Sequence, residues 1–510
     1  MSKVVVIGAG IGGLASSARL AKMGHKVSIY EASDRVGGKC RTEWVGDYAF
    51  DTGPSLLTLP AVYRDLFIRT GKRFETEIGL QAVNPAFAYH FADGTSLEFP
   101  NLSLSDTCTA IDSKLGKRAG DDWHKLMQIA ERMWDVSRGP FIESELPSTL
   151  SLMKRKGFLK DLRVIAPWKS LRGFTKSQTN NAYLQKIVDR YATYSGSDPR
   201  KAPAVLLTIA FIESTFGAWH LKGGLGSLAT ALEKRCLALG VQIHLNSPVA
   251  KILVDGDTAK GIQLRDGLQV EADNVVANAD ADIVYNKLIS PDVHVVKSER
   301  KKLKSADKSL AGFTLLLGLD NSKVTGELPQ MRHHNIFFPE DYDAEFESIF
   351  TAGEPVLDPT IYICAPNDSE MVKGPNKESW SILVNAPRHD PKNGYDWNAE
   401  PGKYAKKIIA KLDALGLRVS ERLDVMEFRT PADLEQSVMA PGGSIYGTSS
   451  NGARAAFRRA SNRSPLKGLY CVGGSAHPGG GLPLVGMSAE LVAEAIGRAD
   501  GTTSSVDSHR

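Results

Sequence analysis

The feature that most constrains this chain is the glycine pattern GAGIGG at residues 8–13, which follows the short β-branched run KVVVI at 3–7. The run predicts a buried parallel strand bounded by glycine. Residues 11–23 predict a helix, and KVSIYE at 26–31 predicts a second strand. The N-terminus is therefore expected to fold as a βαβ unit whose first turn is rich in glycine.

Each glycine of this G-x-G-x-x-G spacing has a physical purpose. Gly8 permits the tight turn, Gly10 lets a pyrophosphate approach the backbone, and Gly13 allows close packing of helix on strand. Gly12 lies in the same turn, where the helix N-terminus offers free N–H groups to phosphates. Glu31 ends the second strand, where a carboxylate accepts hydrogen bonds from a ribose 2′-OH and repels a 2′-phosphate. The pattern predicts FAD or NAD and disfavours NADP.

A second glycine-rich stretch, HPGGGLPLVG, lies at residues 477–486 and precedes an apolar, helix-like run. Glycines 479–481 remove Cβ atoms where a flat ring or a long polyene must approach. Pro483 suits the first turn of a helix. The N-terminus of that helix stabilises negative charge, including charge on a reduced flavin.

Together with two other stretches, these motifs resemble the bacterial and fungal phytoene dehydrogenase family of carotenoid desaturases, within the flavin amine oxidase superfamily. The resemblance is carried by ASDRVGGKCRT at 32–42, FDTGPSLLTLPAVYRDLF at 50–67 and LYCVGGSAHPGGGLPLVGMSAELVAEAI at 469–496. It covers both ends of the chain, and the middle third matches only in general character. It implies FAD as the cofactor.

Three shorter segments fit the same family in the same order: HLKGGLGSLATAL at 220–232, NSPVAKI at 246–252 and ADNVVANAD at 272–280. The resemblance implies that Val249 contacts adenine through its backbone. Many related flavoproteins have a Gly-Asp pair where this chain has Gly473-Gly474-Ser475, so contacts there would fall to backbone N–H groups. The predicted cofactor-binding residues are Gly8, Gly10, Gly12, Gly13, Glu31, Arg35, Gly37, Gly38, Lys39, Gly53, Pro54, Ser55, Val249, Asp280, Gly474, His477, Gly480, Gly481, Leu482 and Val485.

The expected fold class is α/β, with a Rossmann-like FAD-binding domain assembled from separated segments and an inserted substrate domain of mixed sheet plus helices. The FAD-binding segments are 1–75, 220–290 and 436–500. The substrate domain comprises a largely helical, membrane-associating segment at 76–219 and strands with a helix at 291–435. Residues 501–510 are polar and predict a disordered tail.

The resemblance implies a desaturase acting on a long apolar carotenoid, with phytoene as the expected substrate. Hydride leaves an allylic carbon for flavin N5, and oxygen or a quinone takes the electrons, since we find no second nucleotide motif. The sequence identifies neither a metal site nor the proton acceptor. His477 is the one candidate for a catalytic side chain; the alternative is a structural hydrogen bond that locks its loop.

Bulk properties exclude other classes and bear on location. A net charge of +4 gives no reason to expect nucleic acid, and five widely separated cysteines predict reduced thiols in the cytoplasm. We expect neither a signal peptide nor a transmembrane helix, because no apolar run approaches the ~20 residues needed. Residues 133–174 interleave aromatic and aliphatic side chains with Lys and Arg, which suits peripheral membrane docking but also an ordinary amphipathic helical domain.

Three alternatives stay open at this point. A sibling enzyme would act on another carotenoid, as a 3,4-desaturase, a diapophytoene-type desaturase or a ketolase. An amine oxidase would place an aromatic cage at the flavin. A non-catalytic escort of the Rab GDP-dissociation-inhibitor type would have a damaged nucleotide motif, whereas Gly8, Gly10, Gly13 and Glu31 are intact.

Overall fold

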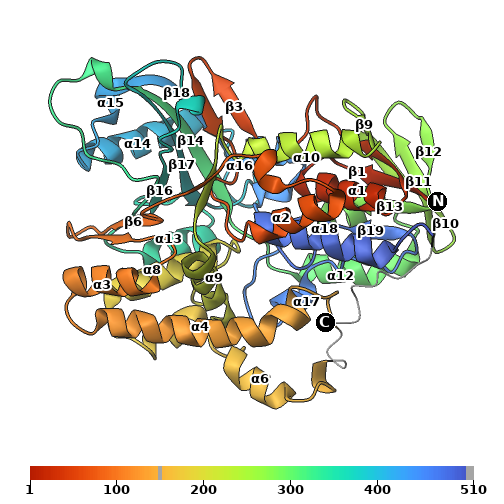
Figure 1. Ribbon diagram of the computed structural model, residues 1–510, viewed down its shortest axis with the longest axis horizontal. Coiled ribbons are helices and arrows are strands. Elements are labelled where there is room, and N and C mark those ends of the chain that lie inside the picture. Colours follow the sequence, from red (N-terminus) through yellow and green to blue (C-terminus); the bar gives the residue numbers. More distant parts are fainter. Residues whose placement is uncertain (148–151, 501–510) are drawn as a thin grey trace.

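The computed structural model describes residues 1–147 and 152–500, which form two lobes built around two separate β-sheets (Figure 1). The sheet of the first lobe has five parallel strands in the order β19–β13–β1–β2–β9. Their bounds are Leu469–Cys471 (β19), Asn274–Ala277 (β13), Lys3–Ile7 (β1), Lys26–Tyr30 (β2) and Gln242–His244 (β9). Strands from both ends and the middle of the chain therefore lie side by side.

Alternation along β1 gives this sheet two apolar faces. Val4 and Val6 pack in one core with helices α1, α10 and α18, whereas Val5 and Ile7 pack in another. The helices on the first face are α1 (Ile11–Lys22), α2 (Ala61–Thr70), α10 (Gly226–Ala238) and α18 (Leu482–Ile496). The second face is covered by the strands β10 (Val249–Asp255), β11 (Thr258–Leu264) and β12 (Gln269–Glu271) and by the helices α11 (Ala281–Ile283) and α12 (Lys297–Ser305).

The second lobe contains a mixed seven-stranded sheet in the order β18–β14–β17–β16–β15–β6–β7. Its neighbouring strands run antiparallel except β15 and β6, which are parallel. The bounds are Leu423–Arg429 (β18), Ala311–Asp320 (β14), Lys377–Ala386 (β17), Ile361–Cys364 (β16), His334–Phe337 (β15), Phe87–His90 (β6) and Ser96–Phe99 (β7).

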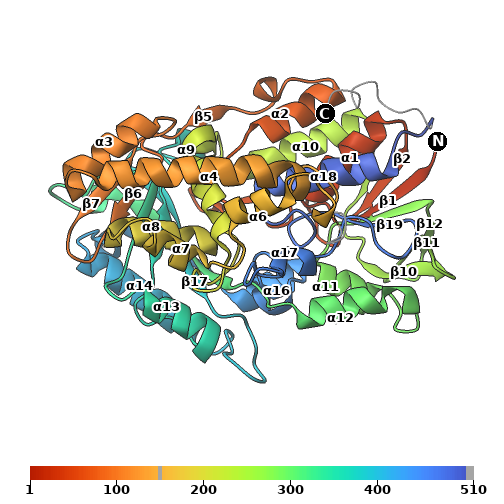
Figure 2. The same ribbon diagram turned by 90° about the horizontal axis from the view of Figure 1, so that it is seen from below.

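Helices cover this sheet differently on its two faces. One face packs Phe313, Leu315 and Ile382 against α14 (Pro401–Ala414), the helix expected from the sequence near 401–415. Strands β6, β7 and β15 of the same sheet pack against the other helices of this lobe. These helices are α3 (Leu104–Leu115), α4 (Ala119–Phe141), α6 (Phe158–Ile165), α7 (Leu171–Lys176), α8 (Ala182–Thr193) and α9 (Thr208–Phe216). Figure 2 shows α6 lying beside the long α4.

Elsewhere in the described chain, two further strand pairs and four short helices lie outside the two large sheets. The strand pairs are β3 (Thr42–Val45) with β4 (Tyr48–Asp51) and β5 (Leu80–Ala82) with β8 (Trp219–Leu221). The remaining short helices are α13 (Asp343–Glu347), α15 (Val419–Arg422), α16 (Pro431–Val438) and α17 (Ala455–Arg458).

The predicted α/β class, with a parallel nucleotide-binding sheet and an inserted mixed sheet, is confirmed. The segment 76–219, expected to be largely helical, also supplies β6 and β7 to the second sheet. The exact division into domains stays a prediction, and the proposed disordered tail at 501–510 lies outside the described residues. Among those residues, no helix is both long and apolar enough to cross a membrane.

Candidate FAD and substrate cavity

The carboxyl ends of the parallel strands open onto one large cavity of about 1090 Å³. The loops that follow β1, β2, β13 and β19 all contribute to its lining. Ligands of open α/β sheets bind at this edge, outside the carboxyl ends of the strands. The cavity continues from there to the seven-stranded sheet, where Gly312, Thr314, Leu383 and Asn385 form part of its lining.

The glycine turn after β1 closes around one side chain, that of Asn278. A Cβ atom added at Gly10 would lie 2.7 Å from Asn278 Nδ2, and one added at Gly12 would lie 2.7 Å from its Oδ1. A Cβ atom added at Gly473, in the loop after β19, would lie 2.6 Å from the same Oδ1. The two glycine motifs therefore meet across Asn278, and backbone is exposed where side chains are excluded. Asn278 lies within ADNVVANAD, but nothing in that stretch distinguished it from its neighbours.

Two helix N-termini face this cavity with their N–H groups available. Helix α1 begins after Gly10 and α18 after Gly481; neither cap residue provides a side-chain hydrogen bond, and neither first turn carries an acidic residue. Ile11 and Gly12 of α1, and Leu482 of α18, line the cavity. Both termini thus offer donors and positive dipole ends to an anionic group. This donor set and the Cβ-free turn fit the pyrophosphate and flavin of FAD.

Glu31 is held in position by the turn that it serves. Its Oε2 accepts a hydrogen bond from the Ala9 N–H at 2.6 Å, and its Oε1 accepts from the Ser33 N–H at 2.9 Å and the Ser33 hydroxyl at 2.8 Å. The carboxylate is thereby fixed at the cavity, where the adenosine ribose of a dinucleotide would lie.

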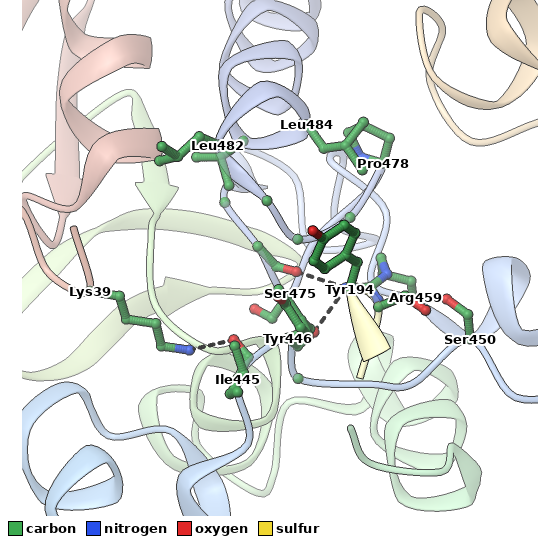
Figure 3. A pocket seen from close by; sticks show the side chains of 18 of the residues that line it. Lys39, Tyr194, Ile445, Tyr446, Ser450, Arg459, Ser475, Pro478, Leu482 and Leu484 are labelled. Atoms are coloured by element: carbon green, nitrogen blue, oxygen red, sulfur yellow. Dashed lines mark hydrogen bonds between the residues drawn. The ribbon is translucent and has the colours of Figure 1, made fainter. Parts of the chain in front are cut away.

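Arg459 and Lys39 hold two loops at the cavity, one after β19 and one around residues 445–448 (Figure 3). Arg459 donates to the carbonyls of Gly474 at 2.7 Å, Tyr446 at 3.0 Å and Thr448 at 2.8 Å, and burial lowers its pKa to about 10. Lys39 donates to the Ile445 carbonyl at 2.7 Å, and burial lowers its pKa. Arg459 thus joins the loop after β19 to the stretch 446–448, and Lys39 fixes the neighbouring residue 445. No local motif marks Arg459 or Tyr446, and neither was predicted.

The structure brings the predicted cofactor residues together with three exceptions. Lining the cavity are Gly8, Gly10, Gly12, Glu31, Gly37, Gly38, Lys39, Gly53, Pro54, Ser55, Val249, Asp280, Gly474, Gly480, Gly481, Leu482 and Val485. Gly13 lies behind the turn, where an added Cβ would come within 2.1 Å of the Gly8 carbonyl oxygen. Arg35 is exposed and pairs with Glu43 at 3.1 Å.

His477 is the third exception, and its surroundings favour the structural interpretation. The side chain is buried, and Nε2 lies 2.9 Å from the Ser144 carbonyl oxygen, to which it donates. Its carbonyl accepts from Asn462 Nδ2 at 2.9 Å. Burial lowers the pKa of His477 to about 4, so the ring is neutral near pH 7. The residue holds its loop in place and does not line the cavity.

The sequence predicted no metal site, but the described part of the chain contains one group of side chains close enough together to hold a metal ion. Among the described residues, the ligand atoms of His333, His334 and Cys364 lie within 4.8 Å of one another. His334 Nδ1 is already hydrogen-bonded to the Tyr362 hydroxyl at 2.8 Å. The absence of a metal stays a prediction.

The part of the cavity remote from the glycine turn is lined mainly by apolar side chains. Helix α9 contributes Ile209 and Ile212, the sheet contributes Ile336 and Leu383, and α6 contributes Phe158, Leu162 and Ile165. The lining also includes Arg190, Tyr194 and Glu213, which no sequence motif singled out. The cavity thus combines a dinucleotide cradle with a long apolar compartment, and this combination defines a two-domain flavin-dependent oxidoreductase.

Comparison with known proteins gives the same class and a narrower family. Residues 11–314 match the family described as flavin containing amine oxidoreductase. The chain is 30% identical to a 4,4'-diapolycopene oxygenase of Methylomonas sp, over 97% of this chain and 98% of that protein. It is 31% identical to a 1-hydroxycarotenoid 3,4-desaturase of Flavobacterium sp. (strain P99-3), over 97% and 99%. It is 30% identical to a zeta-carotene-forming phytoene desaturase of Myxococcus xanthus, over 97% and 93%.

The chain therefore belongs to the flavin containing amine oxidoreductase family and, within it, to the carotenoid desaturases. It is an FAD-dependent oxidoreductase. A solved oxidoreductase from Methanosarcina mazei has the same fold, with a TM-score of 0.65 at 18% identity, covering 96% of this chain and 100% of that one.

Proposed function

We propose that this chain is a carotenoid desaturase that removes hydrogen from a long polyene bound next to FAD. The observation that carries this proposal is the single cavity that continues from the glycine cradle into an apolar compartment. A stiff hydrocarbon chain needs an elongated apolar compartment, whereas a small amine does not. When bound, FAD supplies the hydride acceptor.

The contribution of the protein itself is orientation and exclusion of water. Apolar side chains from α9 and the seven-stranded sheet would hold the polyene, and Gly481, beside which the space is open, would leave room for the flavin ring. A proton must also leave the carbon next to the site of hydride loss.

We propose that the entrance to the apolar compartment lies on a membrane surface. Helix α6 has no buried residue, and Leu159 and Trp168 are 71% and 63% exposed. Exposed Lys160 and Arg163 lie among them, as expected for a surface that contacts anionic headgroups. Because Phe158 and Leu162 of the same helix line the cavity, a lipid-soluble substrate would enter beside α6, the helix at the lower edge of Figure 1.

Two substrates are consistent with this arrangement. Phytoene is the one expected from the sequence, and a relative named for phytoene supports it. A carotenoid that is already modified is the second candidate, favoured by relatives named for diapolycopene and for a 1-hydroxycarotenoid. We propose oxygen or a membrane quinone as the final electron acceptor, and a cytoplasmic location at the membrane surface.

The test is expression of the chain in cells that make phytoene and, separately, in cells that make later carotenoids, with chromatography of the pigments. Conversion of phytoene would support the first candidate. Unchanged phytoene with conversion of a later carotenoid would assign the second. If purified FAD-loaded protein in liposomes left every carotenoid unchanged, the proposed function would be wrong.

A further inference from the structure

A buried polar cluster interrupts the apolar compartment between α8 and α9. The Arg190 guanidinium donates to the hydroxyls of Tyr194 at 2.7 Å and Tyr89 at 3.1 Å, and it lies 3.6 Å from Glu213 Oε1. Arg190 is 5% exposed and Glu213 is 5% exposed. Arg190, Tyr194 and Glu213 all line the cavity. A pure hydrocarbon gains nothing from such a cluster, and burying it carries a desolvation cost.

The hydrogen-bonding capacity of this cluster is unevenly used. Both carboxylate oxygens of Glu213 already accept hydrogen bonds, Oε1 from the Tyr191 hydroxyl at 2.6 Å and Oε2 from the Tyr194 hydroxyl at 3.2 Å. Arg190 Nε, in contrast, has no hydrogen-bond partner among the described residues, although it is buried. The N–H group at Arg190 Nε is therefore available to donate to a ligand.

A second unpaired group lies in the same part of the cavity. The Tyr342 hydroxyl is buried without a hydrogen-bond partner among the described residues, and Tyr342 lines the cavity at 4% exposure. The Phe338 ring connects it to the Arg190 cluster, since its centroid lies 5.3 Å from that of Tyr342 and 6.3 Å from that of Tyr89. Buried polar groups in proteins nearly always have partners, so unpaired ones beside a cavity point to a ligand.

The available groups define the chemistry of that ligand. Arg190 has only donors, so its partner must offer a lone pair. The charges of Arg190 and Glu213 offset each other, which disfavours a carboxylate and favours a neutral oxygen. We propose that Arg190 and Tyr342 bind a hydroxyl or carbonyl oxygen at one end of the polyene, so that the preferred substrate is an oxygenated carotenoid. This inference rests on the proposed function and narrows its substrate class.

The test compares polyenes of equal length that end in a tertiary alcohol, in a carbonyl group or in a hydrocarbon. Binding to FAD-loaded protein is measured as the shift in polyene absorption, and turnover is measured separately by chromatography. We expect the wild-type protein to bind at least one oxygenated polyene about tenfold or more tighter than the hydrocarbon. Which of the two oxygenated polyenes binds tighter decides between hydroxyl and carbonyl.

The variants are chosen so that a folding defect cannot mimic the result. Tyr342→Phe removes a hydroxyl that has no partner among the described residues. Arg190→Lys keeps the charge but removes Nε, together with the two nitrogens that donate to Tyr194 and Tyr89. Each variant should lower the affinity for the oxygenated polyene about tenfold and change the affinity for the hydrocarbon by less than about twofold. Tyr404→Phe is the matched control, since that hydroxyl donates to the Val356 carbonyl away from the cavity, and it should change neither affinity.

Equal wild-type affinity for oxygenated and hydrocarbon polyenes would overturn the inference. So would an equal loss of both affinities in Tyr342→Phe. Selective binding without oxidation of any polyene would instead support the binding site and overturn the proposed desaturase function, so the two failures are distinguishable.

Discussion

Replacing Glu31 by glutamine tests whether the carboxylate after β2 is the group that positions the adenosine half of FAD. The change keeps the side-chain shape but turns one oxygen into an NH₂ group. In the native structure three donors converge on the two oxygens: the Ala9 N–H, the Ser33 N–H and the Ser33 hydroxyl. In Glu31→Gln the NH₂ group must face either Ala9 or Ser33, so at least one backbone donor loses its acceptor.

The size of the effect follows from those contacts. The donor left without its acceptor is unpaired both in the apoprotein and in the FAD complex, so its cost of about 1–3 kcal/mol falls on folding. A hydrogen bond from the ribose to the charged carboxylate, in contrast, is worth about 1.5–3 kcal/mol and is weakened only in the complex. A loss of about 2 kcal/mol in FAD binding corresponds to a roughly 30-fold rise in Kd. A roughly 30- to 100-fold rise in Kd is therefore expected, together with a smaller loss of stability in the apoprotein.

The assay is titration of the apoprotein with FAD, followed by quenching of flavin fluorescence, with thermal unfolding of the apoprotein measured in parallel. Glu271→Gln, an exposed carboxylate on β12, is the matched control and should leave Kd unchanged. A Kd for Glu31→Gln within twofold of the wild-type value, in an apoprotein that still unfolds in one cooperative transition, would refute the assignment of this carboxylate.

Other predictions follow from the same structure. Gly480→Ala should weaken FAD binding at least tenfold, because the new Cβ would meet Tyr446 Cδ1 at 2.2 Å; Gly402→Ala, with open space around it on α14, is the control for fluorescence titration. Leu159→Glu combined with Trp168→Glu should abolish co-flotation with anionic vesicles without altering FAD binding, and unchanged flotation would refute the docking surface. His477 takes up a proton near pH 6.5 in the unfolded chain but only near pH 4 in the folded protein. The unfolded state therefore binds more protons between these values, and the free energy of unfolding falls by about 3 kcal/mol as the pH drops from 6.5 to 4. His477→Gln should remove that part of the pH dependence in denaturant titrations, and an identical slope would contradict the neutral, buried ring.

The sequence predicted those parts of the site whose physical reasons are local. A strand, a glycine turn, a helix and an acidic strand end lie within about thirty residues, so their spacing alone indicated the cradle and Glu31. The glycines of the C-terminal motif were found for the same reason, since each removes a side chain from its own loop. Gly13 and His477 show the limit of this reasoning: both support the turn or loop from behind instead of touching the cavity.

The residues that were missed depend on contacts between distant segments. Asn278 is significant only because Gly10, Gly12 and Gly473 close around it, and no one of those three glycines lies near it in sequence. Arg190 and Glu213 sit on different helices with ordinary amphipathic patterns, so their pairing follows from how α8 and α9 pack. A buried ion pair of this kind leaves no periodic or motif signal in a single sequence.

The meeting of the two glycine motifs across Asn278 has a consequence for how the protein is made. Gly473 follows Gly13 by 460 residues, which a ribosome translating ~5–20 residues per second needs roughly 25–90 s to add. Until residues 274–277 are made the nascent β1 lacks its neighbour β13, and until residues 469–471 are made β13 lacks its neighbour β19. One strand edge therefore stays open to wrong pairing throughout that interval. Cofactor capture must therefore be a late event in biosynthesis, so any truncation or stalled translation before β19 yields a chain that stays colourless and is a target for chaperones and proteases.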